Sequence, residues 1–225
     1  MGSFQTIEAN GKRARVYEAG DATPGVSGVV VFHAWWGLND DIGAYADRLA
    51  TAGFAVTAPD LYVGPVASTI EEAERMSDSF DEPTADAIAL ATIDRLADRL
   101  GATSTLGAVG FSMGGAWSMW SPAQRDRIKA SVVYYGSIEG PSLTRTSVPV
   151  LAHVAETDPY ESEEAVAKFE ATLRDAGREV TIRRYPGTGH WFAEPSRDAY
   201  DAKAADLAFE RTVDFLRRHV HLPPG

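Results

Sequence analysis

Ser112 is the first residue of this sequence whose surroundings suggest covalent chemistry. It stands in the segment Gly110-Phe111-Ser112-Met113-Gly114, which fits the pattern G-x-S-x-G. This pattern is typical of a sharp strand-to-helix turn that lifts a nucleophilic serine above a sheet, and its glycines leave room where strand and helix pass closely. An inert serine in a packing turn is the alternative, and the five residues alone leave both interpretations open.

A serine nucleophile needs a base and an acid, and both follow later in the chain. The hydroxyl is a weak nucleophile, so an imidazole must take its proton and a carboxylate must orient that imidazole. Asp158 comes just after an apolar stretch in PVLAHVAETDPY, and His190 stands in RRYPGTGHWF. The chain order Ser, Asp, His is that of α/β-hydrolases. We therefore predict that Ser112, Asp158 and His190 form a catalytic triad.

Other residues compete for the acid and base roles. Glu156 lies two residues before Asp158, but Asp158 lies further past the apolar stretch, which suits an acid on a loop better. His153 lies within that stretch and is interpreted as a core histidine. His219 and His221 belong to the C-terminal tail, where we expect solvated side chains.

Apolar stretches of strand length alternate with longer amphipathic segments along the chain. The predicted strands are residues 4–9 and 13–19, joined by a turn at Asn10-Gly11, and then 28–34, 54–60, 105–111, 130–136, 148–155 and 180–186. The predicted helices are residues 41–53, capped by Asn39 or Asp40, then 69–79, 84–100, 162–177 and 197–220, and one directly after the serine segment. A mostly parallel sheet with helices on both faces follows from this alternation. We expect a single α/β domain over residues 1–225.

The amino-acid composition excludes some kinds of catalytic chemistry and some classes of binding partner. The formal net charge is -11, and the basic residues form no dense cluster, so we expect neither nucleic acid nor an anionic membrane surface as a partner. The absence of cysteine excludes a cysteine nucleophile and thiolate metal sites. The N-terminus has neither a basic start nor a long apolar run, so we expect a cytoplasmic protein. No metal and no cofactor are expected.

Six short segments spread along the chain form a recognisable set: HAWWGLND, APDLY, GFSMGG, VVYYG, ETDPY and GHWFAEP. Through them the chain resembles the dienelactone hydrolase family of α/β-hydrolases over nearly its whole length. The resemblance implies the α/β-hydrolase fold and an ester hydrolase. It also implies that the backbone N–H of Trp35 joins that of Met113 in an oxyanion hole, and the indoles of Trp35 and Trp36 are candidates for an aromatic wall beside the substrate.

Three departures from the family pattern bear on the substrate. The best-known members have cysteine where this chain has Ser112, and glutamate at the position that matches Ala34. Their dienelactone-cleaving members also hold the substrate carboxylate with two arginines, at positions that align with Ile70 and Glu194. Because an acid would repel an anionic substrate, we expect a neutral one. The predicted substrate-binding residues are Trp36, Ile70, Trp191 and Glu194.

The predicted function is a serine hydrolase that cleaves a small neutral carboxylic ester or lactone through an acyl-enzyme on Ser112. A thioesterase or a perhydrolase on the same triad is the alternative among enzymes. The alternative that is not an enzyme is a protein of the same fold that binds a small molecule without converting it. A monomer or a small homo-oligomer is expected.

Overall fold

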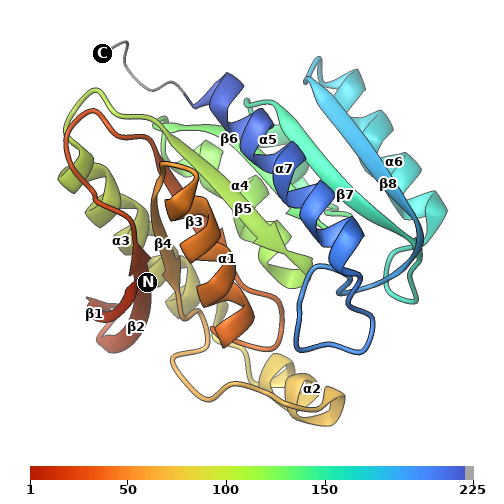
Figure 1. The fold of residues 1–225 in the computed structure, drawn as a ribbon, viewed down its shortest axis with the longest axis horizontal. Coiled ribbons are helices and arrows are strands. Elements are labelled where there is room, and N and C mark those ends of the chain that lie inside the picture. Colours follow the sequence, from red (N-terminus) through yellow and green to blue (C-terminus); the bar gives the residue numbers. More distant parts are fainter. Residues whose placement is uncertain (221–225) are drawn as a thin grey trace.

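An eight-stranded sheet forms the centre of this computed structural model, which describes residues 1–220 (Figure 1). Its strands are β1 (Ser3–Ala9), β2 (Lys12–Ala19), β3 (Gly28–Phe32), β4 (Ala55–Pro59), β5 (Leu106–Phe111), β6 (Ile128–Tyr134), β7 (Val150–Thr157) and β8 (Val180–Gly189). They lie in the order β1-β2-β4-β3-β5-β6-β7-β8. Strand β2 pairs antiparallel with β1 and β4, and the pairs from β4 to β8 are parallel. The predicted α/β fold with a mostly parallel sheet is confirmed.

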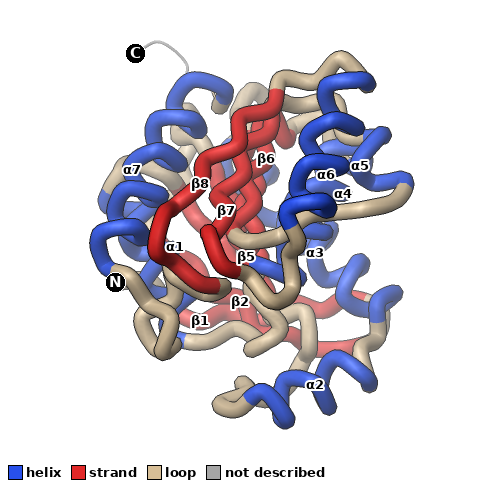
Figure 2. The backbone as a smooth tube through the Cα atoms, turned by 90° about the vertical axis from the view of Figure 1, so that its right-hand side faces the viewer, coloured by secondary structure: helices blue, strands red, loops and turns tan. Residues whose placement is uncertain are grey.

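Helices cover both faces of the sheet (Figure 2). Helices α1 (Asp40–Thr51) and α7 (Ala202–His219) pack on one face. On the other face lie α3 (Glu82–Leu100), α4 (Gly115–Gln124), α5 (Pro141–Arg145) and α6 (Glu163–Asp175). Helix α2 (Ile70–Asp78) lies beyond one end of the sheet, apart from both layers. Within residues 1–220, no helix combines the length and the apolar character that crossing a membrane would need.

The central strands are apolar along their whole length because they are covered on both sides. Every residue of β3 (GVVVF) and of β5 (LGAVGF) is buried. Helices on both faces exclude water from a parallel strand, so no alternation of polar and apolar residues remains. These strands therefore form a rigid support for the residues that follow them.

Helix α7 begins at Ala202 and not at residue 197 as predicted. The side chain of Asp201 accepts a hydrogen bond from the N–H of Ala204, which makes it the N-cap. Before the cap the chain turns, and the N–H of Arg197 donates to the carbonyl of Glu194 at 3.0 Å. The segment that precedes α7 is thus free to take part in the site described below.

Two further boundaries differ from the prediction. Helix α3 begins at Glu82, two residues before the predicted start at residue 84, and Pro83 lies in its first turn, where its missing N–H removes no helical hydrogen bond. Strand β8 continues to Gly189, which pairs with Thr157 beyond an irregularity in the ladder. Because of this extension, β8 leads directly into His190.

The carboxyl ends of the parallel strands meet at one edge of the sheet, where ligands bind in open α/β folds. The residues that follow β3, β5, β7 and β8 therefore come together there. Helix α2 lies at the same end, at the bottom of Figure 1.

Candidate active site

Ser112 lies on a strained turn between β5 and the short 3-10 helix η1 (Ser112–Gly114). Its φ is 48°, in the left-handed region that non-glycine residues rarely adopt. A Cβ atom on Gly110 would overlap the carbonyl of Gly114, and one on Gly114 would overlap the carbonyl of Phe32. The two glycines are therefore required by space, as the G-x-S-x-G pattern predicts.

The structure brings Ser112, His190 and Asp158 into one hydrogen-bonded line. The Oγ atom of Ser112 lies 2.9 Å from Nε2 of His190, and Nδ1 of His190 lies 2.6 Å from Oδ2 of Asp158. The other carboxylate oxygen of Asp158 accepts from the backbone N–H groups of Tyr160 and Glu161. This arrangement leaves Nδ1 of His190 as the donor and Nε2 as the acceptor for the serine hydroxyl.

The competing residues lie elsewhere. Glu156 accepts a hydrogen bond from the N–H of Gly187 at 2.9 Å. His153 is buried, as predicted, and its ring nitrogens lie within 2.9 Å of the hydroxyls of Tyr185 and Thr212. Burial lowers the pKa of His153 to about 3, so this ring is neutral.

Two further histidines, His219 and His221, are at the C-terminal end. His219 is the last residue of α7, and its ring packs against that of Phe215. The His219 side chain is 20% exposed, and its Nε2 atom lies 3.7 Å from a carboxylate oxygen of Glu179. It is therefore less solvated than expected. His221 lies outside the described residues.

The two expected oxyanion donors lie on short turns that follow β3 and β5. Trp35 and Trp36 occupy a turn closed by a hydrogen bond from the N–H of Gly37 to the carbonyl of Ala34 at 3.2 Å. His33, which is buried, accepts a hydrogen bond from the N–H of Leu61 and so ties this turn to the segment after β4. Met113 lies in η1, directly before α4.

An aromatic cluster surrounds His190. Ring centroids of Trp35 and Trp191 lie 5.9 Å apart, and that of Tyr160 lies 5.5 Å from Trp35 and 4.8 Å from His190. Trp36 packs edge-on against Trp191 at 5.0 Å. Tyr160 is 48% exposed, and sequence reasoning missed it although it directly follows the acid loop. The cluster gives the site an aromatic wall.

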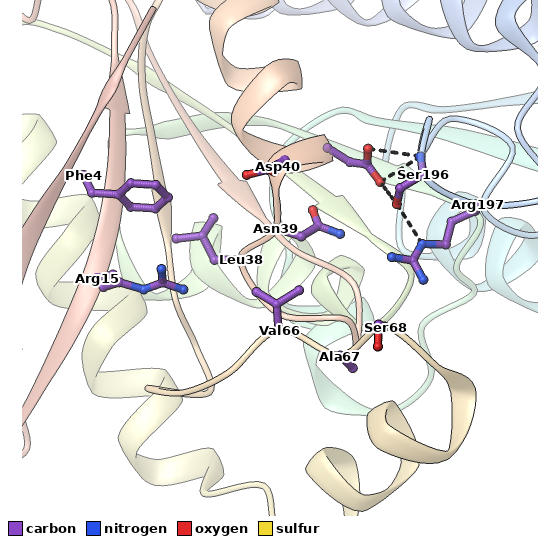
Figure 3. Close-up of a pocket in the computed structure, with 11 residues that line it drawn as sticks. Phe4, Arg15, Leu38, Asn39, Asp40, Val66, Ala67, Ser68, Ser196 and Arg197 are labelled. Atoms are coloured by element: carbon purple, nitrogen blue, oxygen red, sulfur yellow. Dashed lines mark hydrogen bonds between the residues drawn. The ribbon is translucent and has the colours of Figure 1, made fainter.

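A groove runs outward from this wall. Its inner part, about 340 Å³, is lined by residues that include Trp36, Ile70, Trp191 and Arg197. Its outer part, about 510 Å³, has Phe4 and Arg15 on one side and Ser196 and Arg197 on the other, with residues 66–68 below (Figure 3). The Arg197 guanidinium lies 4.0 Å from the centre of the Trp36 ring.

Glu194 does not face this groove, contrary to the expectation from the sequence. Its side chain is enclosed, with 1% exposure, and its Oε1 atom accepts a hydrogen bond from the hydroxyl of Tyr135 at 2.9 Å. Ile70, by contrast, is 42% exposed and lines the groove. The direct substrate contact predicted for Glu194 is therefore corrected, because the fold places this carboxyl beneath the site.

Glu161 is a second carboxyl that the sequence did not single out. Its Oε2 atom accepts hydrogen bonds from both the N–H and the hydroxyl of Ser137. Burial raises the pKa of Glu161 to about 6. This contact ties the loop that carries Asp158 to the segment that follows β6.

The strand order, the strained serine turn and the hydrogen-bonded line of three residues define a protein of the α/β-hydrolase class. The family described as the dienelactone hydrolase family matches residues 14–220. The chain belongs to this family, as the sequence resemblance predicted.

Individual relatives agree with this assignment. The chain is 34% identical to the protein named usf of Aquifex pyrophilus, over 98% of this chain and all of that protein. It is 29% identical, over 95% of this chain and 93% of the relative, to a Bradyrhizobium protein named "Probable 2-oxo-3-(5-oxofuran-2-ylidene)propanoate lactonase". A dienelactone hydrolase-like promiscuous phosphotriesterase from metagenomic libraries has the same fold, with a TM-score of 0.84, 22% identity, and coverage of 98% of this chain and 99% of that one.

Proposed function

We propose that this chain is a carboxylic ester hydrolase that cleaves a small ester or lactone through an acyl-enzyme on Ser112. The observation that carries the proposal is the pair of hydrogen bonds that joins Ser112 to His190 and His190 to Asp158. A serine in this setting attacks a carbonyl carbon while the imidazole takes its proton. The imidazole then passes that proton to the leaving alcohol, and a water activated by His190 releases the acid and frees Ser112.

The tetrahedral intermediate carries a negative oxygen that needs donors in fixed positions. In this proposal the backbone N–H groups of Met113 and Trp35 supply them. Support comes from the position of Met113 before α4, because the N-terminus of a helix favours negative charge. Support for Trp35 comes from the closed turn that follows β3.

The substrate in this proposal is small and neutral. The aromatic wall of Trp35, Trp191 and Tyr160 suits an apolar acyl or alcohol group. The exposed Ile70 adds apolar surface to the groove, and the net charge of -11 opposes the approach of anions. Arg197 and Arg15, which also line the groove, act in the opposite direction.

A fluorophosphonate probe tests the triad without knowledge of the natural substrate. We expect the wild-type chain to be labelled at Ser112 and to hydrolyse short p-nitrophenyl esters. Ser112→Ala is expected to lose both properties while its melting temperature stays close to that of wild type, because one hydroxyl is removed at a partly exposed position. Labelling of Ser112→Ala, or more than about a tenth of the wild-type kcat in that variant, would show that another residue is the nucleophile.

A further inference from the structure

The carboxyl of Glu194 is enclosed beneath the triad with one hydrogen-bond donor. Tyr135 donates to its Oε1 atom, and Oε2 has no partner within residues 1–220. A buried carboxylate needs several donors to offset the loss of water, whereas the uncharged acid loses much less on burial. The environment of Glu194 therefore favours the protonated form.

The charged neighbours of Glu194 act in both directions. Asp41, in the first turn of α1, opposes ionisation, while Arg197 and the hydroxyl of Tyr135 favour it. Burial is the largest influence, and it raises the pKa of Glu194 to about 8. The carboxyl is therefore mainly uncharged at neutral pH and ionises in mildly alkaline solution.

Tyr135 lies between this carboxyl and the catalytic histidine. Its ring centroid is 5.0 Å from that of His190 and 5.4 Å from that of Phe192. Its backbone is held in the left-handed region, with φ of 37°, by an N–H bond to the carbonyl of His153 at 2.7 Å. A side chain on such a constrained backbone has few alternative positions, so a change at its hydroxyl is transmitted to the ring that contacts His190.

We propose that Glu194 is a positioning residue, which in its uncharged form holds the Tyr135 ring against His190 and which on ionisation draws water beneath that ring and loosens its contact with His190. The inference rests on the proposed function, because His190 is taken to be the catalytic base. Neither residue touches the substrate in this proposal.

The expected effect of ionisation is a loss of activity. In the transition state His190 gains a positive charge as the substrate oxygen gains a negative one, so the charge of Glu194 acts on two opposite charges, and its direct effects partly cancel. The carboxylate keeps the hydrogen bond from Tyr135, which it accepts more strongly than the acid does, but its Oε2 atom must gain donors by admitting water. The entry of water beneath the Tyr135 ring is therefore the main consequence.

The primary experiment is the pH dependence of kcat/KM from pH 6 to 10 for wild type and Glu194→Gln. Glutamine keeps an oxygen that accepts from Tyr135 but cannot ionise. We expect the wild-type value to fall above pH 8 by about fivefold or more, and the Glu194→Gln value to stay level while remaining within about threefold of wild type at pH 7. Glu156→Gln, which removes a carboxylate from the exposed end of β7, is the matched control and should retain the fall.

Two further variants give shifts of opposite sign. Tyr135→Phe removes a donor that favours the ionised carboxyl, so the alkaline fall should move to higher pH. Asp41→Asn removes a negative neighbour, so the fall should move to lower pH. A merely structural role would lower kcat at every pH and leave the midpoint of the fall in place.

Thermal stability reports the ionisation without any substrate. The pKa of Glu194 in the folded chain, about 8, is above its ordinary value of 4.5, so the unfolded chain binds fewer protons between these values. Wild type should therefore lose more stability than Glu194→Gln as the pH rises from about 4.5 to about 8. An alkaline fall that persists in Glu194→Gln overturns the inference and leaves the proposed function intact. Absence of both ester hydrolysis and probe labelling overturns the proposed function, and the positioning role with it.

Discussion

Replacing Asp158 by asparagine tests the triad most directly, because it removes one charge and leaves the shape nearly unchanged. The side chains of His190 and Asp158 are 3% and 2% exposed, so water does little to screen their interaction. With charge centres about 4 Å apart and an effective dielectric constant of about 20, the carboxylate stabilises the imidazolium by about 4 kcal/mol. At 1.36 kcal/mol for each factor of ten, this amounts to a loss of about a thousandfold in kcat.

A second effect adds to this loss. The asparagine amide can turn its NH₂ group toward Nδ1 of His190, which lies 2.6 Å from the carboxylate in the native chain. The proton of the imidazole then moves to Nε2, which faces Ser112 and can no longer accept its proton. We therefore expect kcat to fall by about 10³ to 10⁴, with little change in KM.

The assay is the initial rate on p-nitrophenyl acetate at pH 7.5, with the melting temperature as a check on folding. Glu156→Gln is the control and should stay within about threefold of wild type, because Glu156 is exposed and its side chain accepts a hydrogen bond from the N–H of Gly187, which glutamine can also accept. The reasoning is refuted if Asp158→Asn keeps more than about a tenth of the wild-type kcat. A large loss in Glu156→Gln with a small one in Asp158→Asn would assign the acid to Glu156.

Three other outcomes follow from the structure. Gly114→Ala should destabilise the fold by about 3 kcal/mol or more, because its Cβ would overlap the carbonyl of Phe32; a urea midpoint equal to that of wild type would contradict this. Because burial lowers the pKa of His153 to about 3, below its ordinary value of 6.5, the unfolded chain binds more protons between these values, and stability decreases there as the pH is lowered. Urea unfolding should show that wild type loses about 2 kcal/mol more than His153→Gln between pH 6.5 and pH 5, and equal losses would refute the buried neutral ring. In a matched pair of neutral and anionic esters, wild type should have the higher kcat/KM for the neutral ester. Ile70→Arg should reduce the ratio of the two kcat/KM values, and Arg197→Gln should increase it. A clear wild-type preference for the anionic ester would refute the neutral substrate.

The strained serine turn was predictable from five consecutive residues because its glycine pattern is recognisable within them. A Cβ atom on Gly110 would overlap the carbonyl of Gly114 within the turn, whereas one on Gly114 would overlap the carbonyl of Phe32 on β3. The strands were predictable for a related reason: burial on both faces gives continuous apolar stretches such as GVVVF. Asp158 and His190 were predictable from their order after two such strands, because the carboxyl ends of parallel strands meet at one edge.

Glu194 shows where this reasoning stops. Its segment, GHWFAEPSRD, is rich in polar residues and turn formers, which indicates an exposed loop beside the substrate. In the fold, a turn before α7 carries the carboxyl under Tyr135, a residue from the end of β6 that is 59 positions away in the chain. Charge state depends on burial and on neighbours from several strands and helices, and a linear pattern contains neither. The three residues of the hydrogen-bonded line could therefore be inferred from the amino-acid order, whereas the burial of Glu194, the contact of Tyr160 with His190 and the position of the groove required the packed chain.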